Sequence, residues 1–118
     1  MRIYLADDQD KVRSALRLLL EQETGAQVVG EAVDAEGLLA GTTATCPDLV
    51  LLDWELPGLT GGTLSALRRT HPGLCVIALS GRPEARRGAL AAGADAFVSK
   101  ANPPEQLLAA IEKERRKC

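Results

Sequence analysis

The hydrophobic pattern divides the chain into ten segments that alternate between two kinds. Short apolar runs lie at residues 3–6, 28–33, 49–52, 74–79 and 96–98, and they predict strands. The stretches between them carry apolar residues or alanines at helical spacing. These stretches predict helices over residues 12–20, 34–39, 60–67, 83–92 and 102–111. The chain is therefore predicted to repeat a strand–helix unit five times.

The predicted strands 49–52 and 74–79 lack the alternation of polar and apolar residues that a half-exposed strand shows. A strand without alternation is typical of a parallel sheet that is covered by helices on both faces. Five strand–helix units in 118 residues predict an α/β fold with an open, doubly wound parallel sheet. Ligands of such sheets bind beyond the carboxyl ends of the strands, so functional residues are expected directly after strands.

Several residues mark where helices begin and end. Asp34 is suited to cap the second helix, and Thr60 is suited to begin the third. Pro83 suits the first position of an alanine-rich fourth helix, which Gly93 ends, and residues 102–103 open the fifth helix. The fourth helix has few large apolar side chains, so we expect it to be a weakly anchored, mobile surface.

Composition indicates one folded domain over residues 1–118, with 46% hydrophobic and 25% charged residues. The net charge of −2 predicts no basic surface, so direct nucleic-acid binding by this segment is not expected. No apolar stretch is long enough for a signal peptide or a membrane span. The three cysteines are an odd number without metal-like spacing, and Cys75 lies in an apolar run that predicts a core position. We therefore expect a reducing cytoplasm.

Polar residues follow four of the five predicted strands. Asp7 and Asp8 follow the first, Asp53 the third, Ser80 the fourth and Lys100 the fifth. Because the carboxyl ends of parallel strands share one edge of the sheet, we expect these side chains to lie close together.

The chemistry of this set indicates a divalent cation and a phosphoryl group. Three carboxylates at one edge repel one another unless a cation lies among them. Because the ligands are oxygens, with no His or Cys in the set, Mg²⁺ is favoured over zinc. Lys100 adds a positive charge, and the Ser80 hydroxyl can donate to a phosphoryl oxygen. Asp53 is then an activated carboxylate nucleophile, as aspartyl-phosphate chemistry requires.

These residues lie in motifs that resemble a known family. The motifs are Asp7-Asp8, residues 47–53 followed by residues 56–58, Ser80, and residues 93–100. Together and in this order, they are similar to the receiver domains of two-component response regulators over essentially the whole chain. The resemblance implies a flavodoxin-like receiver fold with strand order 2-1-3-4-5 and five helices. The stretch from residue 74 to residue 108 looks most like NarL/LuxR-type regulators, which carry a C-terminal helix-turn-helix domain.

The resemblance implies a role for each site residue. Asp53 would be the phosphoacceptor, and Lys100 would contact the phosphate. The implied Mg²⁺ ligands are Asp8 directly, Asp7 through water, Asp53, and the backbone carbonyl of Glu55.

The resemblance also implies a switch. Ser80 would swing toward the phosphoryl group and Phe97 would move inward, which changes the surface of the fourth helix, fifth strand and fifth helix. Glu55 and Arg82 stand two residues after Asp53 and Ser80, where the family places the path of the attacking water. We hypothesise that these two residues set the phosphoryl lifetime by pairing across the site.

The implied partners are a sensor histidine kinase as phosphodonor, a C-terminal DNA-binding output domain, and a second copy of the chain on phosphorylation. No membrane partner is expected. Because its chemistry is its own phosphorylation and dephosphorylation, the chain is predicted to be a switch rather than an enzyme.

The same residues admit other interpretations. Singly, Asp7-Asp8 suits a helix N-cap, and Lys100 suits a solvated surface lysine. A degenerate receiver would bind partners without phosphorylation, but such chains usually lose an acid or the lysine, and this chain keeps them. An enzyme of the haloacid-dehalogenase type needs Asp-x-Asp, where this chain has Asp53-Trp-Glu55. A nucleotide-binding fold needs a glycine fingerprint, which does not follow the first strand.

Overall fold

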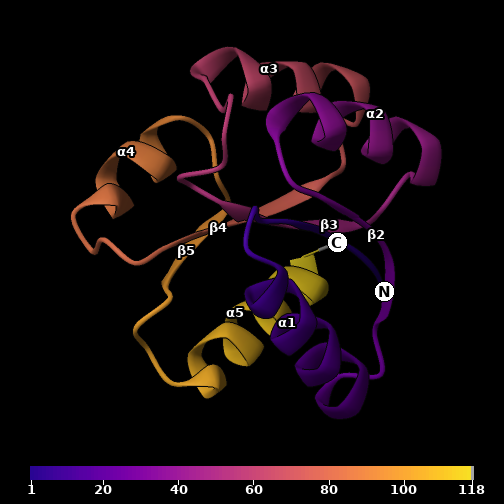
Figure 1. The fold of residues 1–118 in the computed structure, drawn as a ribbon, viewed down its shortest axis with the longest axis vertical. Coiled ribbons are helices and arrows are strands. Elements are labelled where there is room, and N and C mark those ends of the chain that lie inside the picture. The colour runs from indigo at the N-terminus through magenta and orange to yellow at the C-terminus, as the bar shows by residue number, and fades with distance from the viewer. Residues whose placement is uncertain (118) are drawn as a thin grey trace.

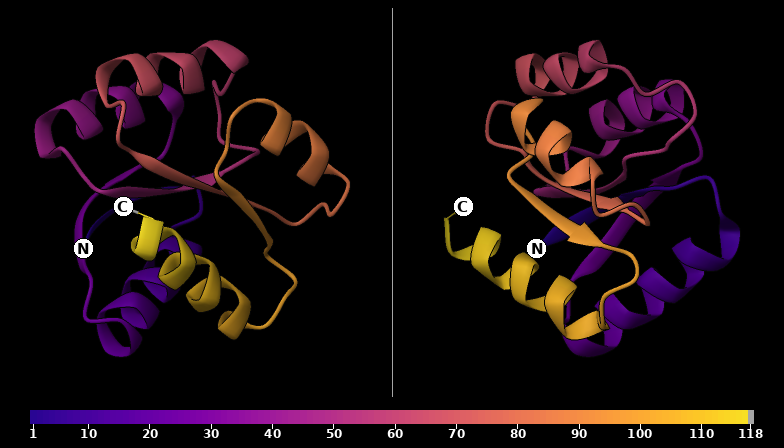
Figure 2. Two further views of the ribbon diagram at one scale, coloured as in Figure 1. Left: turned by 180° about the vertical axis from the view of Figure 1, so that it is seen from behind. Right: turned by 90° about the vertical axis from the view of Figure 1, so that its left-hand side faces the viewer.

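The computed structural model describes residues 1–117, which form a five-stranded parallel sheet between two layers of helices (Figure 1, Figure 2). The strands lie in the order β2-β1-β3-β4-β5, which confirms the predicted doubly wound sheet. The elements in chain order are β1 (Arg2–Ala6), α1 (Asp10–Glu23), β2 (Gln27–Ala32), α2 (Ala35–Thr45), β3 (Leu49–Asp53), α3 (Gly61–Thr70), β4 (Cys75–Ser80), α4 (Ala85–Ala91), β5 (Ala96–Ser99) and α5 (Pro104–Lys117).

The side chains of β1 alternate between two apolar cores, one on each face of the sheet. Ile3 and Leu5 cluster with buried residues of α1 and α5. Tyr4 and Ala6 point the other way and cluster with buried residues of α2 and α3. In Figure 1, α1 and α5 lie below the sheet, and α2, α3 and α4 lie above it.

The two central strands, β3 and β4, are buried at every residue, as their unbroken apolar runs predict. Helices cover both of their faces, so no position along either strand meets water. Asp53 and Ser80 are the last residues of these strands. Both are therefore held at the edge of the best-packed part of the molecule.

Several predicted boundaries differ from the structure by a few residues, as three examples show. The second strand ends before Val33, which is 49% exposed. Helix α4 begins at Ala85 rather than at Pro83, because a turn precedes it. Helix α5 begins at Pro104, one residue later than expected. Two prolines stand side by side there, and either can occupy a first turn, where no backbone N–H is needed.

The predicted helix starts after β2 and β3 are confirmed by their caps. The Asp34 side chain accepts a hydrogen bond of 2.7 Å from the backbone N–H of Gly37. At the start of α3, the backbone N–H of Thr60 donates to Thr63 Oγ1 (3.2 Å). Gly93 follows α4 with a φ of +112°, a conformation that favours glycine.

Helix α4 has only small side chains with which to hold the sheet. Its buried residues are Ala85 and Ala89, which cluster with Phe97 and two further alanines. Each alanine buries little apolar area, so this helix gains less from packing than its neighbours do. The weak anchoring predicted from the sequence is therefore confirmed as a packing feature.

Cys75 is buried in β4, as its apolar run predicts, and it is disulfide-bonded. Within residues 1–117, no helix combines the length and apolar character that crossing a membrane requires.

Candidate functional site

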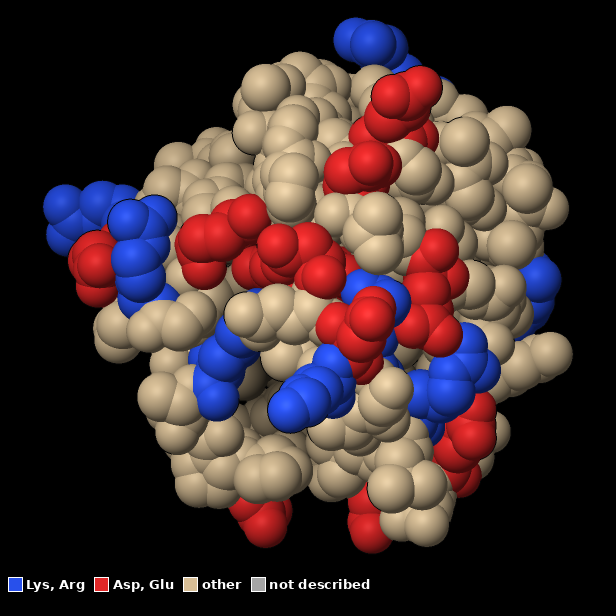
Figure 3. All heavy atoms as spheres, viewed as in Figure 1, with Lys and Arg blue, Asp and Glu red and all other residues tan. Residues whose placement is uncertain are grey.

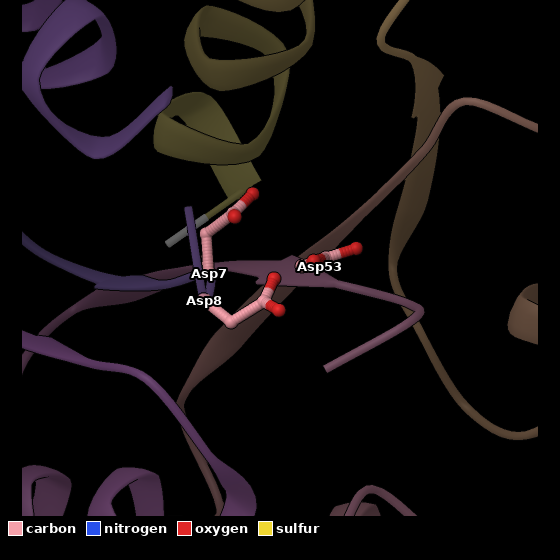
Figure 4. Close-up of side chains that lie close together, drawn as sticks. All are labelled: Asp7, Asp8 and Asp53. Carbon is pink, nitrogen blue, oxygen red and sulfur yellow. The ribbon is translucent and has the colours of Figure 1, made fainter. Parts of the chain in front are cut away.

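The three predicted acids meet at the carboxyl edge of the sheet. β1 and β3 pair in register, with Ala6 opposite Leu52, so the residues that follow lie side by side. One carboxylate oxygen from each of Asp7, Asp8 and Asp53 lies within 4.8 Å of the others. Figure 4 shows the three side chains gathered where β1 and β3 end.

The acids differ in burial and in how they are held. Asp7 is 2% exposed and Asp53 is 3% exposed, whereas Asp8 is exposed to solvent. Asp7 is fixed on both sides: its backbone N–H donates to the carbonyl of Ala32 (3.1 Å), and its Oδ1 accepts from the N–H of Gln9 (2.9 Å). Two buried carboxylates and a third at the rim thus form a pocket of negative charge open to solvent on one side.

Lys100 reaches this cluster from the loop after β5. Its Nζ lies 2.7 Å from Asp7 Oδ2 and 3.4 Å from Asp53 Oδ1. Its backbone N–H donates to the carbonyl of Ser80 (2.8 Å), which sets where the side chain starts. The pKa of Lys100 is raised above its ordinary value. Burial alone would lower this pKa, but the hydrogen bond to Asp7 and the negative charges of Asp7 and Asp53 together outweigh the effect of burial. Lys100 therefore stays cationic.

Burial raises the pKa of Asp53 above its ordinary value, and the charge of Asp7 adds to this effect. The backbone N–H of Glu55, 3.0 Å from Asp53 Oδ1, and the charge of Lys100 both lower it, but they offset only part of the rise. A raised carboxyl pKa means that the ionised form of Asp53 is disfavoured at this buried position, and added positive charge would stabilise it. A bound cation would supply that charge.

The residues present fit a hard divalent cation. The cluster offers carboxylate oxygens, one lysine charge against three acids, and an exposed side at Asp8 through which an ion and its waters can enter. Figure 3 shows a band of acidic side chains across the middle of the face that Figure 1 presents, with basic side chains below it.

Ser80, Glu55 and Arg82 form a second group beside the acids. Ser80 has no exposed surface, and its Oγ donates to the Glu55 carboxylate, at 2.8 Å from Oε1 and 2.9 Å from Oε2. The guanidinium of Arg82 lies 3.8 Å from Glu55 Oε2. The structure thus brings Glu55 and Arg82 together, as the hypothesis built on the family resemblance requires. The contact between Glu55 and Ser80 was not foreseen, because sequence spacing does not show where a flexible side chain folds.

Trp54 is half-buried, and it packs against the alanine cluster under α4 that includes Phe97. Small side chains on α4 leave room for the indole. Phe97 is 8% exposed, so the side chain predicted to switch is turned into the protein in this structure.

Arg13 is a site residue that sequence analysis missed. Its guanidinium donates to the backbone carbonyl of Asp7 (2.7 Å) and to Glu31 Oε1 (2.9 Å). It thereby ties the loop that carries the first two acids to β2. The available signal was an arginine one turn into the helix after Asp7-Asp8.

An apolar groove of about 500 Å³ lies between α1 and α5 and reaches Lys100. Its walls are chiefly aliphatic side chains such as Leu16, Leu19 and Leu107. None of the three acids lines it, so the polar chemistry belongs to the open acidic edge.

Comparison with known proteins identifies a family that matches most of this chain. The family model "Response regulator receiver domain" matches residues 3–112. The nitrate/nitrite response regulator protein NarP of Escherichia coli K12 is 33% identical over 113 residues, which cover 93% of this chain and 53% of NarP. The chain thus spans about half the length of the curated relatives it matches.

Solved structures agree. A LuxR-family two-component response regulator from Aurantimonas sp. SI85-9A1 has a TM-score of 0.87 at 31% identity, over 95% of this chain and 82% of that one. RcsB from Salmonella enterica serovar Typhimurium, bound to promoter rprA in the presence of phosphomimetic BeF3−, has a TM-score of 0.84 at 27% identity, over 98% of both chains. The chain therefore belongs to the response-regulator receiver domain family of two-component signal transduction.

Proposed function

We propose that Asp53 accepts a phosphoryl group from a phosphohistidine of a sensor histidine kinase. The observation that carries this proposal is the meeting of three carboxylates and Lys100 at one edge, with the buried Asp53 at its centre. An Asp53 oxygen attacks phosphorus, the phosphorus–nitrogen bond of the donor breaks, and the imidazole leaves. Lys100, already within reach of Asp53, offsets charge on the transferred group.

The resident metal is Mg²⁺ in this proposal. Asp8 and Asp53 would hold it directly, Asp7 through water, and Glu55 through its backbone carbonyl. When bound, Mg²⁺ neutralises charge that spreads over the phosphoryl oxygens. The raised pKa of Asp53, caused by burial, supports a site that is short of positive charge without the ion.

The proposed output is a change in the surface formed by α4, β5 and α5. Ser80 turns to the phosphoryl group, and weakly anchored α4 shifts over Phe97, which this structure already holds inward. We propose one domain over residues 1–118, a DNA-binding output domain in the whole protein, dimerisation on phosphorylation and a cytoplasmic location. The description of RcsB as bound to a promoter supports the DNA-binding output.

Glu55 and Arg82 are proposed to set how long the phosphoryl group lasts. Their 3.8 Å pairing places both side chains beside Ser80, where water would approach Asp53. Replacing both by alanine and following dephosphorylation by intact mass tests this. An unchanged rate would remove them from control of hydrolysis.

The proposed function is tested with Mg²⁺ and acetyl phosphate. Wild type should gain the mass of one phosphate, whereas Asp53→Asn and an EDTA-treated sample should not. Trp54 adjoins Asp53, so its fluorescence should change in the same samples. If wild type gains no mass and Mg²⁺ leaves Trp54 emission unchanged, the chain acts as a phosphorylation-independent binding module.

A further inference from the structure

The side chain of Glu55 accepts a hydrogen bond from the Ser80 hydroxyl, which the proposed function assigns as a donor to the phosphoryl group. Ser80 Oγ lies 2.8 Å and 2.9 Å from the two Glu55 oxygens, and Ser80 is fully buried. A hydroxyl has one proton, and an ionised carboxylate can only accept, so that proton is donated to Glu55. While this bond lasts, Ser80 has no proton to give to a phosphoryl oxygen on Asp53.

Arg82 closes this group from the other side. Its backbone N–H donates to Ser80 Oγ (3.0 Å), and its guanidinium lies 3.8 Å from Glu55 Oε2. The Ser80 hydroxyl thus donates to Glu55 and accepts from the backbone N–H of Arg82. A hydrogen bond to a carboxylate is stronger than one between neutral groups. The bond to Glu55 therefore stabilises this rotamer of Ser80.

We propose that Glu55 is a latch: a positioning residue that keeps the Ser80 hydroxyl from Asp53 until a phosphoryl group displaces it. This inference rests on the proposed phosphoryl-acceptor function and concerns the step before transfer, not the lifetime afterwards. The anionic phosphoryl oxygens replace the Glu55 carboxylate as acceptors of the same proton. The cost of that exchange opposes phosphorylation and disfavours switching without a donor.

Without the Glu55 carboxylate, the Ser80 hydroxyl can donate to a phosphoryl oxygen without first breaking a hydrogen bond. With Mg²⁺ present, Glu55→Ala should tighten binding of the phosphoryl analogue beryllofluoride by roughly 10-fold, the scale of one hydrogen bond to a charged group. Glu55→Gln keeps a neutral acceptor at the same place, so its affinity should lie between those of wild type and Glu55→Ala. Glu55 is an exposed loop residue, so neither change removes core packing.

Glu55 is also a negative charge near an anion site, and its removal could tighten binding by that effect alone. Ser80→Ala separates the two causes, because a latch acts only through the hydroxyl, whereas charge repulsion acts without it. The experiment titrates beryllofluoride into wild type, Glu55→Ala, Ser80→Ala and the double variant, with Trp54 fluorescence as the readout.

Tightening by Glu55→Ala in the wild-type background, but not in the Ser80→Ala background, supports the latch. Equal tightening in both backgrounds, or none in the wild type, overturns it while leaving the proposed function intact. A silent wild type beside a responding Glu55→Ala variant also supports it. If neither protein responds to Mg²⁺ and beryllofluoride, the proposed function fails and the latch fails with it.

Discussion

Acidic side chains lie at both ends of the sheet, and the amino end uses them as structural ties. Asp48 Oδ2 accepts from the backbone N–H of Arg2 (2.7 Å), and Asp95 Oδ2 accepts from that of Val76 (2.7 Å). Asp95 also receives a hydrogen bond from the Arg68 guanidinium (2.8 Å). Each acid thus joins the start of its own strand to the start of the neighbouring one.

At the carboxyl end, the acids face one another instead. One oxygen from each of Asp7, Asp8 and Asp53 lies within 4.8 Å of the others, and Lys100 pairs with Asp7 and Asp53. Burial raises the pKa of Asp53 there. A carboxylate beside a strand is therefore a structural tie where donors meet it, and part of a cluster of negative charge where other acids meet it. The difference lies in the partners rather than in the residue type.

The largest expected effect is on the phosphorylation rate, when the basic side chain at each end of the sheet is replaced in turn by methionine. Lys100→Met should slow phosphorylation by acetyl phosphate by about 100-fold, the scale of losing one group that stabilises transferred charge. The matched change Arg68→Met removes a cation from the amino end and should leave the rate unchanged. Intact-mass time courses with Mg²⁺ measure both. Equal rates for Lys100→Met and wild type would show that the two ends do not differ in this way.

Next in size is the structural tie itself. Asp95→Ala should lower the free energy of unfolding by about 1 kcal/mol, because the N–H of Val76 and the guanidinium of Arg68 lose their acceptor at a partly exposed site. Urea unfolding measures this change, and phosphorylation should proceed at the wild-type rate. A stable variant that cannot be phosphorylated would place Asp95 in the functional site.

Sequence pattern predicted the fold and the carboxyl-edge set well, because both depend on periodicity and strand ends. The parallel sheet and the meeting of Asp7, Asp8 and Asp53 follow from five strand–helix units, whereas the order of the strands was implied by the family resemblance. The ties made by Asp48 and Asp95 were not predicted. Each depends on which backbone N–H lies opposite, which is a property of strand register.

Side-chain direction set the other limit of prediction. Trp54 folds into space left by alanines of α4, and Glu55 folds back onto Ser80. Both outcomes depend on shapes contributed by segments far apart in the chain. Local spacing carries no such information.

A smaller effect is expected on the stability of the metal-free protein. Asp53→Asn should raise the free energy of unfolding in EDTA by roughly 1 kcal/mol, since it removes a buried charge that faces other acids. Because the folded pKa of Asp53 is raised, wild type carries this penalty at neutral pH and loses it as pH falls through that pKa. The gain from Asp53→Asn should therefore shrink in acid. A loss of stability at neutral pH would show that Asp53 is already fully compensated by Lys100.

The smallest effect tests an acid that lies on the functional side of the sheet but has the partners of a tie. Glu31, near the carboxyl end of β2, contacts Arg13 (2.9 Å) and Arg17, and the hydrogen bond from Arg17 is the main cause that lowers its pKa. Glu31→Gln should cost less than about 1 kcal/mol, because the pairs are partly exposed.

The pH dependence of this change should be opposite to that of Asp53→Asn. A lowered folded pKa gives Glu31 a stabilising contribution that is full above the ordinary glutamate pKa and is lost as pH falls through the folded value. At neutral pH, Glu31→Gln should therefore be less stable than wild type, whereas Asp53→Asn should be more stable. Both differences should shrink as the pH falls. Urea unfolding at several pH values in EDTA measures both. If both variants changed the free energy of unfolding in the same direction at neutral pH, the hydrogen-bonding partners would not determine whether a carboxylate at this edge stabilises the fold.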